Sequence, residues 1–477
     1  MFPLLVFLIP LAVRAVPEIL MSPYIVGFDP VGYYVPTILR WLREGVSFWE
    51  YMATAPLLDT VLMQLASLGV PLTLSLKIIP PILHGFLALA IYFFAYKAMT
   101  WSNRKSLLVA LLATLYFVGL RVSWDMLKNE LGLVFLFVAL ILLQDGKKFW
   151  KHYGLLSLAM SLLVLAHPFV AVIMFVIIAI TIVRMLLDFR YGEARSLTLT
   201  SIPATLLFLL IVYARYVMNY SVIGVFSARE SEGWLSLFGF ASYQDMVVNT
   251  LSFLLYCYLP LLPLVIVGSR RLNNLPIKLW VLWSLVAILS PIISPNAFIP
   301  GLWRWTLMLV YPFAFYATEA LACLKAKTRL IIGLILVALT LGFVVMPSES
   351  PFPYYALYPY YVPSSMLQNT VPLRDCQDTV DELRWLGSNM HGDARLLAHT
   401  AFYGWALLVL DEDRVISYGY GSPGKAAQEA LQGGHDQLYL IWWTDGDGWH
   451  GQPTVPSSFK EVHRSGRIAI YNYAQTD

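Results

Sequence analysis

The chain has 477 residues, of which 58% are hydrophobic and only 13% are charged. Soluble domains carry about 25% charged residues, so this composition excludes a soluble globular protein and predicts an integral membrane protein. The formal net charge of +3 is too small to indicate nucleic-acid binding.

About eleven apolar stretches have the length and composition of helices that cross a bilayer. We place them near residues 2–21, 73–97, 106–121, 130–144, 153–167, 168–187, 197–217, 246–267, 277–294, 305–323 and 329–346. The first stretch contains Arg14 and Glu18, and no small-residue cleavage site follows it. We therefore expect it to remain as the first span rather than to act as a signal peptide.

Basic residues gather in alternate connections between these spans. The richer set contains Lys97, Arg104, Lys105, Lys147, Lys148, Lys151, Arg184, Arg190, Arg195, Arg270, Arg271, Lys278, Lys325, Lys327 and Arg329. Because basic loops stay on the cytoplasmic side, the sequence predicts a cytoplasmic N-terminus and, after an odd number of spans, an extracellular C-terminus at the plasma membrane.

The first external loop, residues 22–72, contains the segment FDPVGYYVPTILRWLREG. Its apolar residues fall on one helical face, which predicts a helix in the plane of the interface: Val31, Tyr34, Val35, Ile38, Leu39 and Leu42. Asp29 precedes Pro30, an arrangement with which many helices start. Local sequence leaves open whether Asp29 caps this helix, does chemistry at the membrane surface, or does both.

Three further candidate sites lie at the external ends of spans. The connection GLRVSWDMLKNELGLVF brings together Arg121, Asp125, Lys128, Asn129 and Glu130. Such groups line a functional cavity or form a plain interfacial salt-bridge cluster. Arg304, between two tryptophans, suits a phosphate but also an interface anchor. His167, before Pro168, is a site residue or a packed, hydrogen-bonded histidine.

The C-terminal part resembles a soluble domain joined to the spans by a linker. Residues 347–365 are rich in Pro and Tyr and suit an interfacial linker. Residues 366–477 predict a small extracytoplasmic α/β domain with helices over 378–389 and 424–432 and strands over 394–400, 414–420, 436–443 and 467–473. The motif GYGSPGK, residues 419–425, lacks the Walker spacing, so we interpret it as a strand-to-helix turn.

Taken together, the chain resembles the GT-C superfamily of integral membrane glycosyltransferases. The features that carry the resemblance are a cytoplasmic N-terminus, a long first external loop opening with FDP and aromatic residues, and an external α/β domain. It is most similar to archaeal-type members, including the catalytic subunit of oligosaccharyltransferase, and more distantly to protein mannosyltransferases. The resemblance implies a donor sugar on a polyprenyl phosphate or pyrophosphate, and an essential acidic residue in the first loop.

Carried over residue by residue, the loop acid is Asp29 and the phosphate-binding arginine of a late span is Arg304. The Asp-Asn-Glu-Gly run of oligosaccharyltransferases resembles KNELG, where Asn129 and Glu130 match and Lys128 replaces the Asp. This exchange removes a metal ligand and adds a donor for phosphate. It implies a lipid monophosphate donor and no required cofactor, with Mg or Mn as the alternative.

Two departures from oligosaccharyltransferases concern the acceptor. The arginine that they carry six residues after the loop acid is Val35 here. Their WWDYG motif after the last span is matched only by WWTDG, residues 442–446, near the end of the chain. Recognition of a glycosylation sequon is therefore not implied, and the acceptor is a glycan, a lipid or a protein.

The expected reaction is single displacement with inversion, with Asp29 as the base. The cations expected to hold the leaving phosphate are Arg304, Lys128 and Arg121. The residues expected to orient the sugar or the loop are Asp125, Asn129, Glu130, His167, Tyr33 and Tyr34. The polyprenyl tail would lie among membrane lipid, in an apolar groove between spans.

Two other classes of function remain as alternatives. A polytopic transporter or lipid flippase would need polar groups near the bilayer midplane and often a repeat between its halves, whereas the ionisable groups here gather at the external mouth. A non-catalytic membrane receptor would make Asp29 dispensable.

Overall fold

The structure is a computed structural model, in which we describe residues 2–144, 150–219, 242–293, 299, 301–347, 362–418, 423–435, 437–444 and 455–473. Most of the predicted linker lies outside these residues, as do residues 419–422 of the GYGSPGK motif and residues 445–446 of WWTDG.

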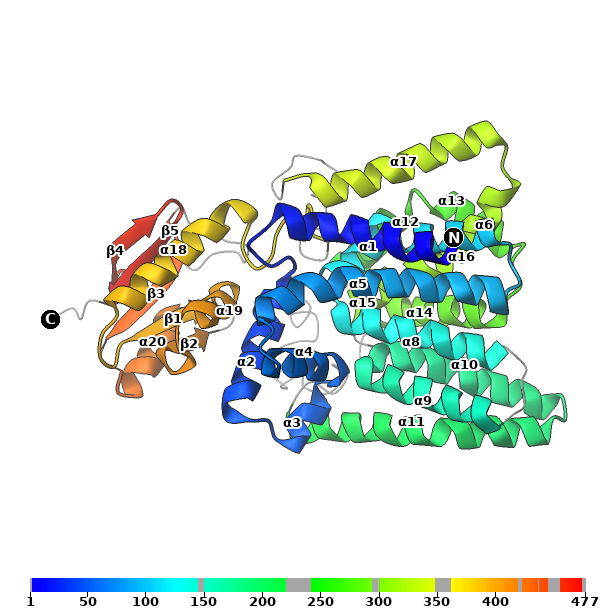
Figure 1. Ribbon diagram of the computed structural model, residues 1–477, viewed down its shortest axis with the longest axis horizontal. Coiled ribbons are helices and arrows are strands. Elements are labelled where there is room, and N and C mark those ends of the chain that lie inside the picture. Colours follow the sequence, from blue (N-terminus) through cyan, green and yellow to red (C-terminus); the bar gives the residue numbers. More distant parts are fainter. Residues whose placement is uncertain are drawn as a thin grey trace.

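The first 346 residues form a helical bundle and the loop that covers one of its ends (Figure 1). The helices are α1 (Phe2–Leu20), η1 (Pro30–Tyr34), α2 (Val35–Glu44), α3 (Phe48–Ala53), α4 (Leu57–Ser67), α5 (Leu72–Phe93), η2 (Phe94–Ala98), α6 (Asn103–Leu115), α7 (Phe117–Asp125), α8 (Leu127–Gln144), α9 (Trp150–Ala166), α10 (Pro168–Leu187), α11 (Tyr191–Val217), α12 (Tyr243–Tyr258), α13 (Leu262–Ser269), α14 (Leu275–Ile293), α15 (Leu302–Met308), α16 (Val310–Cys323) and α17 (Ala326–Val345).

The protein is a multi-pass helical membrane protein, as the sequence predicts. Within the described residues, eight helices are long and apolar enough to cross a membrane. The number rises to ten if two bent pairs each form one span, α6 with α7 at 59° and α12 with α13 at 83°. The predicted number of about eleven is higher because it counts the stretch at 153–167, and α9 has only 17 residues there.

The first loop folds into η1 and three short helices rather than one long helix. Four residues of the predicted apolar face, Val31, Tyr34, Val35 and Ile38, are buried against the protein itself. Leu42, predicted on the same face, is 40% exposed. Trp41 is buried instead and donates its indole N–H to Glu50 over 2.9 Å.

Within the described residues, the C-terminal domain is a five-stranded sheet with three α-helices. Its strands are β1 (Arg395–His399), β2 (Val415–Tyr418), β3 (Leu438–Trp443), β4 (Phe459–Ser465) and β5 (Ile468–Tyr473), and its helices are α18 (Leu373–Asn389), α19 (Thr400–Val409) and α20 (Pro423–Gln432). The strand order is β2-β1-β3-β5-β4, parallel for β1 with β2 and β3 and antiparallel in the pairs of β5. Six elements match the prediction, and α19 and β4 are additional.

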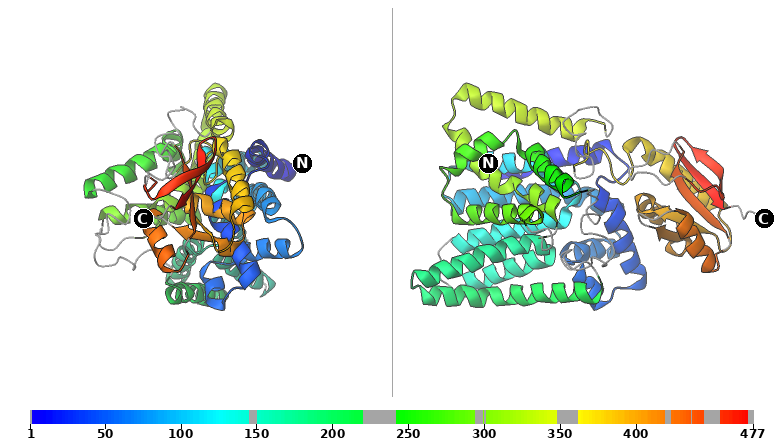
Figure 2. Two further views of the ribbon diagram at one scale, coloured as in Figure 1. Left: turned by 90° about the vertical axis from the view of Figure 1, so that its left-hand side faces the viewer. Right: turned by 180° about the vertical axis from the view of Figure 1, so that it is seen from behind.

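The sheet domain covers one end of the bundle, and the N-terminus lies at the other end (Figures 1 and 2). Helix α19 makes the contact, packing against η1 and α2. At Gly404 the two backbones meet so closely that a Cβ would lie 1.8 Å from the carbonyl oxygen of Val31. Only glycine fits this position, so the domain is tied directly to the turn that follows Asp29.

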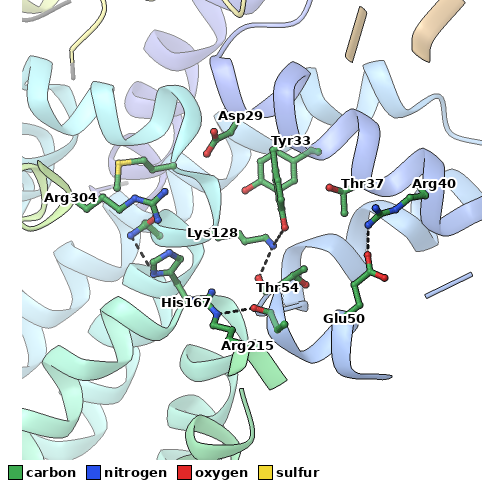
Figure 3. Close-up of a pocket in the computed structure, with 14 residues that line it drawn as sticks. Asp29, Tyr33, Thr37, Arg40, Glu50, Thr54, Lys128, His167, Arg215 and Arg304 are labelled. Carbon is green, nitrogen blue, oxygen red and sulfur yellow. Dashed lines mark hydrogen bonds and ion pairs between the residues drawn. The ribbon is translucent and has the colours of Figure 1, made fainter. Parts of the chain in front are cut away.

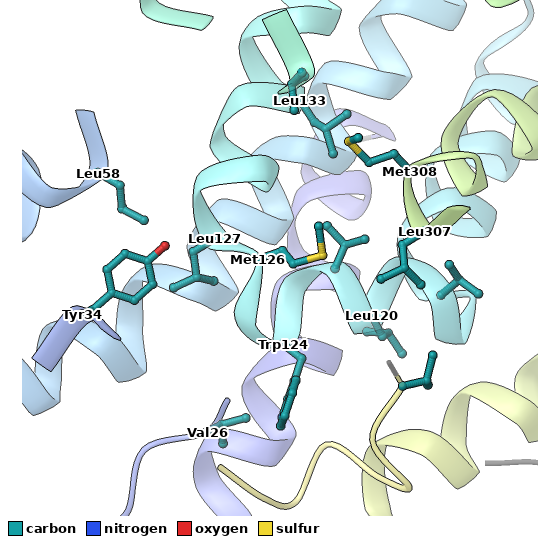
Figure 4. Close-up of a cluster of buried hydrophobic side chains, with 14 of the residues drawn as sticks. Val26, Tyr34, Leu58, Leu120, Trp124, Met126, Leu127, Leu133, Leu307 and Met308 are labelled. Atoms are coloured by element: carbon teal, nitrogen blue, oxygen red, sulfur yellow. The ribbon is translucent and has the colours of Figure 1, made fainter. Parts of the chain in front are cut away.

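Below this end, apolar side chains from distant segments pack together (Figure 4). They include Val26, Tyr34, Leu58, Leu120, Trp124, Met126, Leu127, Leu133, Leu307 and Met308. This core packs the first loop against α7, α8 and α15, and it supports the polar residues of the loop.

We expect Gly404→Ala to destabilise the protein by about 1–3 kcal/mol, because the added methyl group overpacks the contact with Val31. Thermal unfolding in detergent measures the change. Gly154→Ala is the matched control, since nothing lies within 4 Å of its Cβ position and alanine favours a helix. Equal melting temperatures for the two variants would contradict the close contact.

Candidate active site

A cavity of about 350 Å³ opens at the end of the bundle that faces the sheet domain (Figure 3). Its walls come from the first loop, from the starts of α8 and α15, from the turn before α10 and from the end of α11. The residues that line it are Asp29, Tyr33, Tyr34, Thr37, Arg40, Glu50, Ala53, Thr54, Met126, Lys128, Asn129, His167, Arg215 and Arg304.

Asp29 stands at the start of η1, a single turn of π-helix, and faces the cavity. Its side chain makes no capping hydrogen bond, and its backbone is helical, with φ −61° and ψ −35°. Such π turns are frequent at functional sites. The Asp29 carboxylate therefore does not cap this helix.

The surroundings of Asp29 raise the pKa of its carboxyl group to about 7. Burial is the largest cause, and the negative charge of Asp125 adds to it. The positive charges of Arg304, Arg121 and Lys128 act in the opposite direction. A carboxylate with this pKa can accept a proton near neutral pH.

Lys128 lies at the start of α8, opposite the loop, and its ammonium group is fully hydrogen-bonded. It donates to the carbonyl of Thr54 over 2.8 Å, to Asp59 over 2.6 Å and to the hydroxyl of Tyr33 over 3.1 Å. An ammonium group has three hydrogens, so all three have partners. Lys128 therefore contributes positive charge to the cavity, but it can bond to a phosphate only by exchanging one of these partners.

Sequence reasoning did not select Asp59, although this carboxylate is completely buried and pairs with Lys128. It lies in the first turn of α4, where an acidic residue is ordinary. No local signal distinguishes it, because its partner is 69 residues away.

Two arginines face the cavity without a carboxylate partner among the described residues. Arg304 lies in the first turn of α15, with its guanidinium 5.0 Å from the centre of the Trp303 ring. Arg215 lies in the last turn of α11 and donates its Nε–H to the carbonyl of Ala53 over 2.8 Å. The remaining N–H groups of both can bind an anion. Sequence reasoning did not select Arg215 as a site residue.

His167 and Asn129 form the wall next to these arginines. The Nδ2 of Asn129 lies 3.4 Å from the Nδ1 of His167, and the imidazole stacks on Phe169 with 5.6 Å between ring centres. Burial and the charges of Arg304 and Arg215 hold the pKa of His167 well below its usual value. His167 is therefore a neutral hydrogen-bonding group at physiological pH.

Three of the predicted site residues do not line the cavity. Arg121 and Asp125 are buried and form an ion pair within α7. The guanidinium of Arg121 lies over the Trp124 and Trp303 rings, 5.1 and 5.6 Å from their centres. These two residues act on Asp29 through their charges.

Glu130, the third, is fully buried inside the bundle. Its Oε1 lies 2.6 Å from the Nδ1 of His84, whose Nε2 lies 3.1 Å from the carbonyl of Thr114. Because Glu130 is paired with His84 inside the bundle, it belongs to the packing behind the cavity wall.

In the described part of the chain, no three His, Cys, Asp or Glu side chains come together as a metal site requires. The positively charged residues that line the cavity are Arg40, which pairs with Glu50, and Lys128, Arg215 and Arg304.

Comparison with known proteins identifies the fold. No family model and no curated protein sequence matches the chain. Among solved structures, ArnT from Cupriavidus metallidurans bound to undecaprenyl phosphate superposes with a TM-score of 0.58 at 12% identity, over 99% of this chain and 98% of that chain. The same protein in the apo state gives 0.57 at 12% identity, over 98% and 97%.

The arabinofuranosyltransferase AftD from Mycobacteria matches 99% of this chain, with a TM-score of 0.50 and 13% identity, but only 40% of its own length is covered. ArnT and AftD are both GT-C proteins. The chain is thus a multi-pass membrane protein with the GT-C fold, as the resemblance of its sequence implied.

We expect Asp59→Ala to destabilise the protein by about 3–5 kcal/mol, because it leaves the buried ammonium of Lys128 without its counterion. The free energy of unfolding in detergent is the measurement. Glu461→Ala is the control: it removes the exposed ion pair with Arg464 and should change stability by less than about 1 kcal/mol. A stability of Asp59→Ala equal to this control would rule out the buried pair.

Proposed function

We propose that the protein is a membrane glycosyltransferase that moves a sugar from a polyprenyl-phosphate donor to an acceptor on the external side of the membrane. The observation that carries the proposal is one cavity that holds a carboxylate with a pKa of about 7 beside two arginines free of carboxylate partners in the described chain. The likeness in fold to ArnT, solved with undecaprenyl phosphate, supports a lipid phosphate as the ligand.

In the reaction we propose, Asp29 accepts the proton of an acceptor hydroxyl as the acceptor oxygen bonds to the anomeric carbon. The bond from that carbon to the phosphate oxygen breaks on the opposite face, so the configuration inverts and the polyprenyl phosphate leaves with the electron pair. A leaving phosphate anion needs nearby cations, but it needs no acid if it departs unprotonated.

The residues divide between these two tasks by their place in the cavity. Arg304 and Arg215 contact the phosphate through free N–H groups, while Lys128 and the more distant Arg121 add positive charge. Tyr33, whose hydroxyl lies 3.1 Å from the Nζ of Lys128, orients the sugar.

The other residues at the cavity position the sugar and the wall. Tyr34, Asn129 and the neutral His167 line the cavity and offer hydrogen bonds to sugar hydroxyls. Asp125 and Glu130 keep the wall in place through Arg121 and His84. Divalent cations are not required for this reaction, which activity in excess EDTA tests directly.

The transporter or flippase alternative fits the position of the cavity less well. A transport site lies near the bilayer midplane. Here the cavity lies at the end of the bundle, where the first loop meets the starts and ends of the spanning helices (Figure 3).

The first test is turnover of a panel of synthetic polyprenyl-phosphate monosaccharides by the purified wild type and by Asp29→Asn. We expect the wild type to release polyprenyl phosphate, and the variant to bind the same donor but to react about 10²–10⁴-fold more slowly, because it lacks the base. Asp393→Asn, at an exposed position, serves as the control. Full activity of a folded Asp29→Asn variant would exclude the base, and failure of every donor to bind the wild type would exclude the lipid phosphate.

The pH profile follows from the raised pKa of Asp29. The base must be ionised, so kcat/KM should fall as the pH drops through about 7 and level off above it. Asp125→Asn removes the negative charge that raises this pKa and should move the limb to lower pH. Measuring kcat/KM from pH 5 to 9 for both proteins checks the shift. A limb that moves to higher pH in the variant would contradict the electrostatic coupling.

A further inference from the structure

The segment 362–371, between the linker and α18, is buried although it is polar. Ser365, Gln368, Asn369 and Thr370 are each at most 2% exposed. Burying polar groups is unfavourable unless they are hydrogen-bonded. The side chains of Ser365, Asn369 and Thr370 have such partners, and Gln368 bonds through its backbone carbonyl. Those partners include the loop that carries Asp29.

Two hydrogen bonds join this segment to the chain just before Asp29, and a third joins it to Trp124 of α7. The carbonyl of Gln368 accepts from the backbone N–H of Gly27 over 3.0 Å and from the indole N–H of Trp124 over 3.2 Å. The Nδ2 of Asn369 donates to the carbonyl of Ile25 over 2.8 Å. The bonds at Gly27 and Ile25 hold the chain two and four residues before Asp29, respectively.

Asn369 is itself held rigidly. Its Oδ1 accepts from the backbone N–H of Val371 over 2.9 Å, which closes a local turn and fixes the amide plane. The backbone N–H of Asn369 donates to the carbonyl of Val371 over 3.3 Å. With its oxygen fixed in this way, the amide nitrogen is held in place to donate to Ile25, and it also lies 3.6 Å from the Sγ of Cys376.

The same segment also holds the turn that follows Asp29. Thr370 approaches Gly32 of η1, where a Cβ would lie 3.3 Å from its methyl carbon. The hydroxyl of Thr370 accepts from the indole N–H of Trp405 in α19 over 3.0 Å. Because Asp29 has no capping bond of its own, its direction depends on the backbone on either side, and segment 362–371 fixes both sides.

We propose that Asn369 is a positioning residue for Asp29, through which the C-terminal domain sets the rate of sugar transfer. This inference rests on the proposed function, since it concerns the same carboxylate. Asn369 does not line the cavity. Loss of its bond to Ile25 lets the loop relax, so that Asp29 is misplaced and reached by water. A misplacement of about 1 Å costs up to about 10²-fold in rate.

The test compares full-length Asn369→Ala with the wild type on a polyprenyl-phosphate donor. We expect kcat to fall at least about 10-fold while the dissociation constant for polyprenyl phosphate changes less than about twofold, because the phosphate-binding arginines are untouched. The acid limb of kcat/KM should move to lower pH, because burial is the main cause of the raised pKa of Asp29. Hydrogen exchange in residues 25–34 should become faster.

Asn389→Ala is the matched control. It removes an Asn side chain of the same domain that donates to the carbonyl of Trp385 over 2.8 Å, at the exposed end of α18. It should behave as the wild type in all four measurements. If Asn369→Ala does not fold, Trp124→Phe removes the indole bond to Gln368, keeps an aromatic ring at this position, and should lower kcat and speed the exchange of residues 25–34 in the same way.

The outcomes separate this inference from the proposed function. Unchanged kcat or unchanged exchange of residues 25–34 in a folded Asn369→Ala variant would overturn the positioning role alone. An equal loss of donor binding and kcat would also overturn it, because the whole site would then have been disturbed. A wild type that turns over no donor would overturn the proposed function and this inference with it.

Discussion

The desolvation of a carboxylate at the membrane edge is the constraint on which this structure depends. Asp29 faces a cavity closed in by the first loop and the helix ends, and burial there raises its pKa to about 7. The same burial would be too costly without positive charge nearby, which Arg304, Arg121 and Lys128 provide. The site therefore depends on a balance between the desolvation of the Asp29 carboxylate and its attraction to several cations.

Most of the buried ionisable groups in the described part of the bundle are paired with an opposite charge, and this makes the exceptions informative. Arg14 binds Glu18 over 2.9 Å, Lys128 binds Asp59 over 2.6 Å, and Glu130 lies 2.6 Å from His84. Removing one partner of such a pair leaves an unpaired buried charge and destabilises the protein, so these pairs have a structural role. Arg304 and Arg215 lack a carboxylate partner in the described chain, and both face the cavity. An anionic ligand bound there would supply the missing negative charge.

The C-terminal domain is part of the architecture of the site rather than an appendage. Gly404 of α19 lies against Val31, and the buried segment that follows the linker bonds to Ile25 and Gly27. The loop that carries Asp29 is thus packed between the bundle and the sheet domain. A short loop at a membrane surface would otherwise move freely, since loops with few buried contacts open easily.

The sequence by itself determined the class of fold and pointed to Asp29 as a candidate site residue. Long apolar stretches can bury their backbone in a membrane only as helices, so the spans could be located from composition. Alternating strand patterns likewise located four of the five strands of the C-terminal domain. The FDP segment indicated Asp29, because a charged residue shortly after an apolar span can be recognised from the local sequence.

Only the tertiary structure decided which other residues meet Asp29. Asp59 and Lys128 are 69 residues apart, and Arg215 and Ala53 are 162 apart, so no local pattern connects them. Arg121 and Glu130 look equivalent to Lys128 in the sequence, yet helix packing turns them away from the cavity. No local pattern indicates Asn369 for the same reason. Its proposed role depends on a hydrogen bond between residues 344 positions apart in the chain, and only the topology of the fold brings these residues together.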